Sequence, residues 1–223
     1  EDVAHAVPLA EALVAGGLTV LEVTLRTPAA LDSISAMRAA VPGAVIGAGT
    51  VINAAQFAAA AAAGSQFVVS PGFLPCLVAA AKDHGIPLLP GATTPTEILA
   101  ALDAGIDTLK FFPAAQSGGA AMLRALAAPL PDVAFCPTGG ITFANAPDYL
   151  SLPNVLCVGM SSIVTKAWLD AGDWAAIRSA ASEASSAESR CSSAATISRR
   201  RCARGDSGDS SPVRAAALRV QRS

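Results

Sequence analysis

Thr19-Val-Leu-Glu-Val-Thr-Leu25 is a short apolar run, and six further runs of this kind follow it along the chain. They are Ala44–Gly49, Gln66–Ser70, Ile86–Pro90, Thr108–Phe112, Val133–Pro137 and Val155–Gly159. Their starts lie 20 to 25 residues apart, which is the length of one strand and one crossover helix. Because the runs are almost wholly apolar, we expect strands that are buried on both faces of a parallel sheet.

Helical patterns fill the intervals between these runs, and several of them end at a glycine. They span Val3–Ala15, Ala54–Ala63, Leu74–Asp83 and Thr96–Ala104. Glycine directly after the last turn is typical of helix ends. Repeated strand–helix units predict an α/β fold, and seven such strands indicate a (β/α)8 TIM barrel. The chain begins inside the first helical pattern, so we expect the barrel to lack its first strand.

The composition fits one barrel domain in a reducing compartment. Hydrophobic residues make up 52% of the 223 residues and charged residues 14%, which is enough apolar surface for a large core. No apolar run approaches the roughly 18 residues of a membrane span, and no signal peptide is visible. The five cysteines lack CxxC spacing, and Cys136 and Cys157 lie in apolar runs, where buried thiols are expected. We therefore predict a cytoplasmic protein without membrane contact.

Charge divides the sequence at residue 178. Residues 1–178 carry a net charge of −6, whereas residues 179–223 carry +4 and contain 12 Ser, 10 Ala and eight Arg. The second segment has too little apolar surface to offset its ordering entropy. We predict a barrel domain at 1–178 and a disordered tail at 179–223. An Arg/Ser-rich nucleic-acid arm is the alternative, but the tail has no aromatic residue for base stacking, so we expect no nucleic-acid partner.

Lys110 is the residue that points to a function, because it lies in the middle of the apolar run Thr108–Phe112. A lysine inside a doubly buried strand is costly unless its amine is paired or neutral. A buried carboxylate partner would be a purely structural explanation. A neutral amine would be a nucleophile at neutral pH, as in imine-forming lysines. Composition alone leaves both explanations open.

Alternation along the strands places further charged side chains with this amine. Glu22 and Arg26 share one face of their strand, opposite an apolar face that belongs against the helices. If the polar faces point into the barrel, a carboxylate, a guanidinium and the Lys110 amine share one enclosed space. That combination suits carbonyl chemistry, because it offers an imine-forming amine, an acid–base group and a carboxylate anchor. A surface edge strand is the alternative explanation for Glu22 and Arg26.

Glycine-bearing segments follow the last two runs, at Pro137-Thr-Gly-Gly-Ile141 and Gly159-Met-Ser-Ser162. In barrels of this class, the loops after the seventh and eighth strands frequently bind phosphate through backbone N–H groups. The order and spacing of the two segments therefore favour a phosphate site. No histidine, cysteine or carboxylate cluster has metal-ligand spacing, and no dinucleotide or P-loop motif is present. We expect neither a metal nor a cofactor.

Six ordered motifs resemble the family of 2-keto-3-deoxy-6-phosphogluconate (KDPG) aldolase, also described as 4-hydroxy-2-oxoglutarate (KHG) aldolase, over about residues 3–178. The motifs are Gly-Gly-Leu-Thr-Val-Leu-Glu22-Val-Thr-Leu-Arg26-Thr, Ile-Gly-Ala-Gly-Thr50-Val, Val-Ser-Pro71-Gly, Leu-Pro-Gly-Ala-Thr-Thr-Pro-Thr-Glu, Leu-Lys110-Phe-Phe-Pro-Ala and Cys-Pro-Thr138-Gly-Gly-Ile. The resemblance implies a metal-free class I aldolase that cleaves 2-dehydro-3-deoxy-6-phosphogluconate to pyruvate and glyceraldehyde 3-phosphate. It also implies a homotrimer of the Entner–Doudoroff pathway.

The resemblance further implies roles for individual residues. Lys110 would form the imine, and Glu22 would accept and return the protons. The other substrate contacts would come from Arg26 and Thr50 at the pyruvate carboxylate, Pro71 and Phe112 in the pocket wall, and Thr138, Gly139, Gly140 and Ser161 at the sugar-acid or phosphate end. Met160 stands where a second glycine is expected, so it would crowd the phosphate. The alternatives are therefore an aldolase for KHG or for the 6-phosphogalactonate epimer, or a non-catalytic truncated remnant.

Overall fold

The computed structural model describes the backbone of residues 2–192 and the side chains of residues 2–186. The chain divides into two compact units. The first comprises residues up to Gly91 together with Ile163–Ser185, and the second comprises Ala92–Ser162 and, among the described residues, 186–192. Within the described part, no helix is both long enough and apolar enough to cross a membrane.

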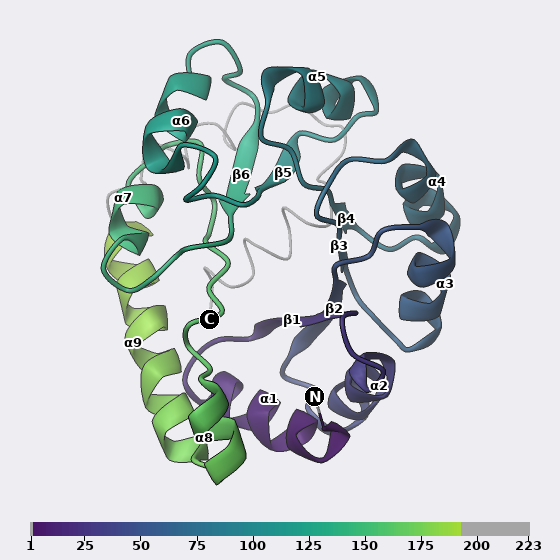
Figure 1. Cartoon of the computed structure of the whole chain (residues 1–223), viewed down its shortest axis with the longest axis vertical. Helices are drawn as coiled ribbons and strands as arrows, with labels where there is room; N and C mark the ends of the chain where they lie inside the picture. The colour runs from purple at the N-terminus through teal and green to yellow at the C-terminus, as the bar shows by residue number, and fades with distance from the viewer. Residues whose placement is uncertain (1, 193–223) are drawn as a thin grey trace. The chain divides into compact units, whose positions relative to one another are not determined.

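The first unit contains a parallel four-stranded sheet in the order β1-β2-β3-β4. The strands are β1 (Val20–Thr24), β2 (Val45–Gly49), β3 (Val68–Val69) and β4 (Leu88–Leu89). The connecting helices α2 (Ala30–Ala40), α3 (Ala54–Ala62) and α4 (Pro75–His84) lie on one face of this sheet (Figure 1). A 3-10 turn, η1 (Val3–His5), and α1 (Ala6–Ala15) precede β1. The fully buried side chains of this unit include Ile34, Ile46, Phe57, Val68 and Leu77.

Local sequence signals explain where these helices begin and end. Asn53 caps α3, because its side-chain oxygen accepts a hydrogen bond from the Gln56 N–H at 2.9 Å. Pro75 opens α4, where a missing N–H costs nothing. Gly85 ends α4 at φ 63°, a left-handed conformation that glycine adopts without steric cost. The helices predicted at 54–63 and 74–83 are confirmed to within one residue at either end.

The second unit contains a parallel pair of strands, β5 (Thr108–Phe111) and β6 (Ala134–Pro137). Its helices are α5 (Pro95–Asp103), α6 (Gly119–Leu126) and α7 (Ala146–Leu150). The Phe111 and Phe135 rings meet edge to face with centroids 6.1 Å apart, and both side chains are fully buried. The apolar residues of the two runs therefore form the core of this unit.

The seventh predicted strand, Val155–Gly159, is not continuous. It forms two isolated parallel bridges with the β6 region, Phe135↔Val155 and Thr138↔Gly159. The Phe135 N–H donates to Asn154 at 2.8 Å and the Leu156 N–H donates to Phe135 at 3.0 Å. The next donor of a regular parallel ladder would be residue 137, but proline has no N–H. The ladder is interrupted there, and it resumes displaced by one residue.

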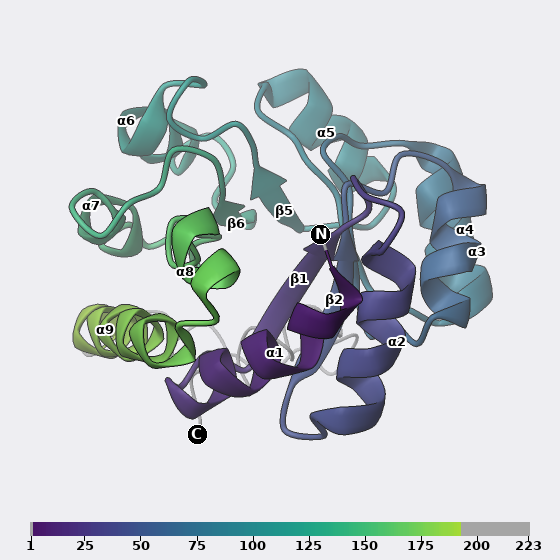
Figure 2. The same cartoon turned by 60° about the horizontal axis from the view of Figure 1, so that its bottom comes forward.

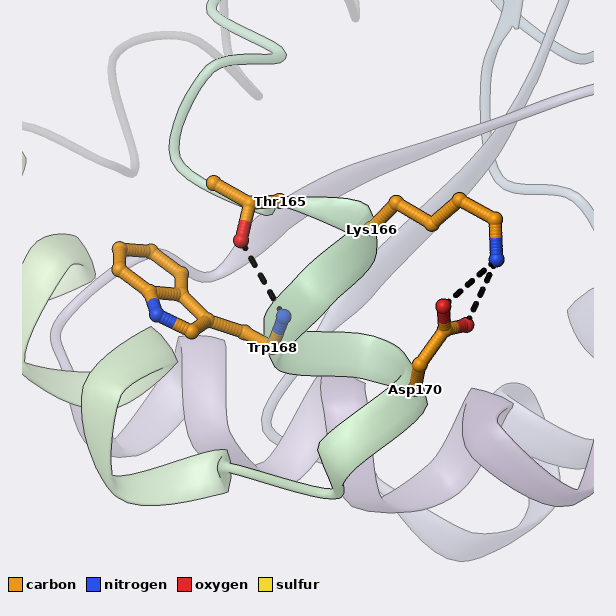
Figure 3. A network of polar contacts seen from close by, with 4 residues as sticks. All are labelled: Thr165, Lys166, Trp168 and Asp170. Atoms are coloured by element: carbon orange, nitrogen blue, oxygen red, sulfur yellow. Dashed lines mark hydrogen bonds and ion pairs between the residues drawn. The ribbon is translucent and has the colours of Figure 1, made fainter.

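The two C-terminal helices of the described chain are α8 (Lys166–Ala171) and α9 (Trp174–Ser192). Figure 3 shows the side chains that define α8. Thr165 caps it by accepting a hydrogen bond from the Trp168 N–H at 3.2 Å, and Lys166 forms an ion pair with Asp170 at 2.7 Å. The ion pair is exposed, so we expect a small contribution to stability.

Helix α9 corrects the predicted domain boundary at residue 178. The helix continues to Ser192, and Ile177, Ala180, Ala181 and Ala184 are buried on one side of it. These positions follow the i, i+3, i+4, i+7 spacing of an amphipathic helix, with alanine as the apolar residue. Predicted disorder is therefore wrong for residues 179–192, and the prediction for 193–223 lies outside the described residues.

Candidate active site

Lys110 occupies the third position of β5, and every residue of this strand is buried. Its exposed fraction is 7%, and the neighbouring Thr108 on the same face is 3% exposed. The β5–β6 register pairs Lys110 with Cys136, so these two side chains project from the same face of the sheet. The structure thus confirms that a strand buries this lysine.

The Phe112 ring is an aromatic partner of the Lys110 amine. Lys110 Nζ lies 5.0 Å from the ring centroid, which is within the range of a cation–π contact. Gly139 packs on the same ring, because a β-carbon on it would lie 3.3 Å from two ring carbons. Gly139 also has φ 96°, a conformation that suits glycine alone. The loop after β6 therefore holds the ring against the lysine.

Thr138 and Gly140 continue this loop. Thr138 projects from the Lys110 face, with its hydroxyl oxygen 4.0 Å from the Cys136 sulfur. Gly159 fits closely against the Thr138 side chain, since a β-carbon on Gly159 would lie 3.0 Å from the Thr138 Cγ2 atom. Asn145 fixes the end of the loop by donating to the Gly140 carbonyl at 2.9 Å. Asn145 was not predicted from sequence, because a loop asparagine carries no distinguishing signal.

Ser161 follows the second bridge and is exposed, whereas the preceding Met160 is half-buried. Ser162 donates from its hydroxyl to the Ile141 carbonyl at 3.4 Å and so links this segment to the glycine loop. The two glycine-bearing segments predicted from sequence are therefore adjacent in the second unit. Their hydroxyls and backbone groups form one polar edge beyond the strand ends.

Glu22 lies in the middle of β1, and its side chain extends over β2. A β-carbon on Gly49 would lie 2.6 Å from the Glu22 carboxyl carbon and 2.7 Å from its Cγ atom. The carboxylate thus occupies space that a side chain at position 49 would take. Gly49 carries no distinguishing signal in the sequence, because a glycine at a strand end usually only terminates the strand.

Arg26 and Thr50 follow the ends of β1 and β2. The Arg26 Nε–H donates to the Thr24 hydroxyl at 3.1 Å, which holds the guanidinium beside the strand end. Thr50 has φ 59°, which is an unusual and strained conformation for a β-branched residue. Such strained residues concentrate at functional sites, so this conformation is independent support for a role of Thr50. Pro71 follows β3, with its carbonyl packed against Gly91.

One expectation about this site is wrong. Glu22 and Arg26 are predicted from sequence to be enclosed, but both side chains are exposed. The Glu22 side chain extends toward the carboxyl end of β1 and covers Gly49. Arg26 lies beyond Thr24, the last residue of β1. The burial predicted for a charged residue therefore holds at Lys110 and fails at these two positions.

The candidate residues of both units lie toward the carboxyl ends of parallel strands. In the first unit they are Glu22, Arg26, Thr50 and Pro71; in the second they are Lys110, Phe112, Thr138, Gly139, Gly140 and Ser161. Active sites of α/β barrels are built at this end of the strands. Among the described residues, no group of three or more His, Cys, Asp or Glu could hold a metal ion. His5 contacts Trp174 and His84 stacks on Phe57, with ring centroids 5.8 and 5.7 Å apart.

Comparisons with known proteins agree with this arrangement. The profile of the KDPG and KHG aldolase family matches residues 1–180. A 2-dehydro-3-deoxy-phosphogluconate aldolase of Pseudoalteromonas atlantica is 52% identical over 184 residues, which are 82% of this chain and 86% of the relative.

Two solved structures of such aldolases are also similar. The enzyme of Zymomonas mobilis ZM4 with 3-phosphoglycerate has a TM-score of 0.78 at 50% identity, over 82% of this chain and 86% of that one. The enzyme of Legionella pneumophila, with pyruvate captured as a covalent carbinolamine, has a TM-score of 0.80 at 44% identity, over 82% and 89%. Together with the alternation of parallel strands and helices, these likenesses establish the predicted fold class, the (β/α)8 barrel.

Proposed function

Because this chain belongs to the KDPG and KHG aldolase family, we propose that it cleaves 2-dehydro-3-deoxy-6-phosphogluconate to pyruvate and glyceraldehyde 3-phosphate through an imine on Lys110. It is a carbon–carbon lyase. The observation that carries the imine assignment is the position of Lys110, which is 7% exposed inside β5 and lies against the Phe112 ring. An imine forms when a lysine amine attacks the ketone of the substrate as a nucleophile.

The proposed reaction begins with attack of the Lys110 amine on the C2 keto carbon. Loss of water from the carbinolamine gives an iminium ion, which draws electrons from the adjacent carbons. Glu22 removes the proton of the C4 hydroxyl, the C3–C4 bond breaks, and its electron pair passes to the iminium to form an enamine. The aldehyde leaves as glyceraldehyde 3-phosphate. Protonation at C3 and hydrolysis then release pyruvate and restore the amine.

The remaining residues are proposed to hold the two ends of the substrate. Arg26 and Thr50 would bind the pyruvate carboxylate, since a guanidinium pairs well with a carboxylate. Pro71 and Phe112 would line the pocket. Thr138, Gly139, Gly140 and Ser161 would bind the phosphate end. Support for the last group comes from the neighbouring glycine loops of the second unit and from the phosphorylated ligand in the Zymomonas mobilis relative.

Reductive trapping tests the imine. Incubation with pyruvate and borohydride is expected to leave one pyruvate-derived secondary amine, on Lys110, which peptide mass spectrometry locates. Lys110→Arg should abolish both this adduct and substrate cleavage. Lys82→Arg and Lys166→Arg are matched controls, because both lysines are exposed, and each variant should keep full activity. A folded sample that gives no adduct, or an adduct on another lysine, would contradict the proposal.

A second substrate is supported by the family description, which includes KHG aldolases. KHG carries a carboxylate in place of the phosphorylated end, so contacts with the phosphate decide between the two. Hydrogen bonds to a charged group contribute about 1.5–3 kcal/mol, and we therefore expect kcat/KM to favour the phosphorylated substrate by about ten- to a hundredfold. Met160→Gly should increase this preference if Met160 crowds the phosphate. Parallel assays with the 6-phosphogalactonate epimer measure the stereochemical preference.

We also propose that the protein acts as a cytoplasmic homotrimer in the Entner–Doudoroff pathway, as the family resemblance implies. Exposed large apolar side chains support a subunit contact in the first unit, where Ile52 is 51% and Leu74 is 40% exposed near the starts of α3 and α4. Sedimentation equilibrium of the full chain tests this proposal. A monomer at micromolar concentration would contradict it.

A further inference from the structure

We propose that Gly49 is a positioning residue, which leaves the space that the Glu22 carboxylate needs in order to act as the proton acceptor. The inference rests on the proposed function, because it assumes that Glu22 transfers protons. It goes beyond that function by giving a mechanistic role to a glycine, which has no side chain to take part in the reaction.

The register of β1 and β2 places Glu22 and Gly49 on the same face of neighbouring strands. Glu22 pairs with Gly47 and Thr24 pairs with Gly49, so Gly49 lies one alternation beyond the partner of Glu22 on the same face. The Glu22 side chain leans along the strand toward this position. A β-carbon on Gly49 would meet the Glu22 carboxyl oxygen Oε1 most closely, then the carboxyl carbon at 2.6 Å and Cγ at 2.7 Å. Every one of these contacts is shorter than real β-carbons tolerate.

Backbone conformation does not explain the glycine. Gly49 is the last residue of a regular strand and has no positive φ, so its conformation is open to any residue. Glycine weakens a strand interior, since it loses more conformational freedom than other residues and packs no side chain. The space that it leaves is therefore the physical reason for its presence.

The neighbouring glycine provides an internal comparison. A β-carbon on Gly47 would lie 2.5 Å from the Phe67 Cδ2 atom, and Phe67 is a buried ring. A side chain at Gly47 would thus disturb the core. A side chain at Gly49 would instead displace an exposed carboxylate, which can rotate into solvent. The two positions should therefore separate a loss of stability from a loss of chemistry.

Steady-state kinetics on Gly49→Ala, Glu22→Gln and the double variant test this inference. We expect Gly49→Ala to fold and to lower kcat/KM by about ten- to a hundredfold, because a misplacement of about 1 Å can have that effect. In the Glu22→Gln background the same change should lower kcat/KM by less than about twofold, since two residues that act through one group are not additive. The pH profile of kcat/KM should also change in Gly49→Ala.

Gly47→Ala is the matched control. It should lower the melting temperature through the Phe67 contact, while the folded fraction keeps the kcat/KM and the pH profile of the parent. If Gly49→Ala does not fold, Glu22→Ala/Gly49→Ala decides the question, because removing the Glu22 carboxyl group vacates the space and should restore folding. A double variant that stays unfolded would overturn the inference.

The outcomes separate the two levels of the proposal. Full activity of Glu22→Gln would remove Glu22 from the proposed function. If Glu22→Gln is impaired but Gly49→Ala is as active as the parent, or its loss is additive with that of Glu22→Gln, the positioning role of Gly49 is wrong and the role of Glu22 stands.

Discussion

At Lys110, an imine mechanism makes two opposed demands on one nitrogen. The amine must be uncharged to attack the ketone, but the iminium that follows is a cation. The face of the Phe112 ring, 5.0 Å from the nitrogen, favours the cation. The ring therefore acts on the iminium step of the cycle.

Phe112→Leu tests the contribution of the ring, because it keeps an apolar side chain and removes the π face. Cation–π contacts contribute about 0.5–2 kcal/mol, so we expect the equilibrium fraction of iminium to fall by about two- to thirtyfold. Borohydride trapping over a range of pyruvate concentrations measures this fraction. Phe112→Tyr keeps the aromatic face and should match the parent. If Phe112→Leu raises the KM for pyruvate but leaves trapping unchanged, the ring only lines the pocket and does not stabilise the iminium.

Some properties of the residues at this site could be predicted from the sequence and others could not. Lys110 was predictable, because a charge in the middle of an apolar strand is conspicuous without any coordinates. The exposure of Glu22 was not predictable. Alternation tells which face of the strand a side chain projects from, but not how far the side chain extends along the strand. The role of Gly49 depends on a contact between two strands, which the sequence of one strand does not contain.

At the scale of elements, helix boundaries follow capping rules that can be read directly from the sequence. Helix α5 begins with a reciprocal capping box. The Thr94 hydroxyl accepts from the Glu97 N–H at 3.3 Å, and the Glu97 carboxylate accepts from the Thr94 N–H at 2.8 Å. Hydrogen bonds from the Thr93 and Thr94 backbone lower the pKa of Glu97 below its usual value of 4.5. Helix α9 cannot be recognised from the sequence in this way. Its buried positions are mostly alanine, and alanine does not distinguish an amphipathic helix from a disordered segment.

Glu97→Gln should remove the pH-dependent part of this cap. The folded-state pKa lies below the unfolded value, so the carboxylate adds stability above pH 4.5 and loses it as the pH falls through the folded pKa. We expect the variant to be about 0.5–1 kcal/mol less stable at pH 7 and the difference to shrink toward pH 3. Urea unfolding at several pH values measures this. Asp103→Asn, at the other end of α5, should show no such loss, and a pH-independent difference for Glu97→Gln would contradict the prediction.

At the scale of the whole molecule, the first compact unit packs its C-terminal segment, Ile163–Ser185, against the start of the chain. Helix α9 contacts the turn after α1, and His5 of η1 meets Trp174 of α9 with ring centroids 5.8 Å apart. Figure 2 shows α9 beside α1. A β-carbon on Gly16 would lie 2.7 Å from the Arg178 carbonyl oxygen and still closer to the Ala181 side chain. The contact therefore depends on a missing side chain.

Gly16→Ala is expected to destabilise the fold by about 1–3 kcal/mol, because the extra methyl group overpacks this contact. Gly16 has φ −85°, which alanine adopts freely, so the effect is steric. Gly43→Ala is the control, since its β-carbon would meet only Val14 Cγ1, at 3.8 Å. Chemical denaturation of both variants provides the comparison. Equal stability of the two would show that α9 shifts at little cost.

The proline in β6 has a consequence for the geometry of everything that follows it. On the β5 side, the backbone N–H groups of the even-numbered residues of β6 donate hydrogen bonds, as Thr138 does to Phe111. Pro137 therefore removes no hydrogen bond between β5 and β6. On the other side, the offset between partners changes from 20 residues at Val155 to 21 at Gly159. Since side chains alternate along a strand, a slip of one residue exchanges inside for outside. One absent hydrogen on a backbone nitrogen thereby exchanges the two faces of the segment between Val155 and Gly159.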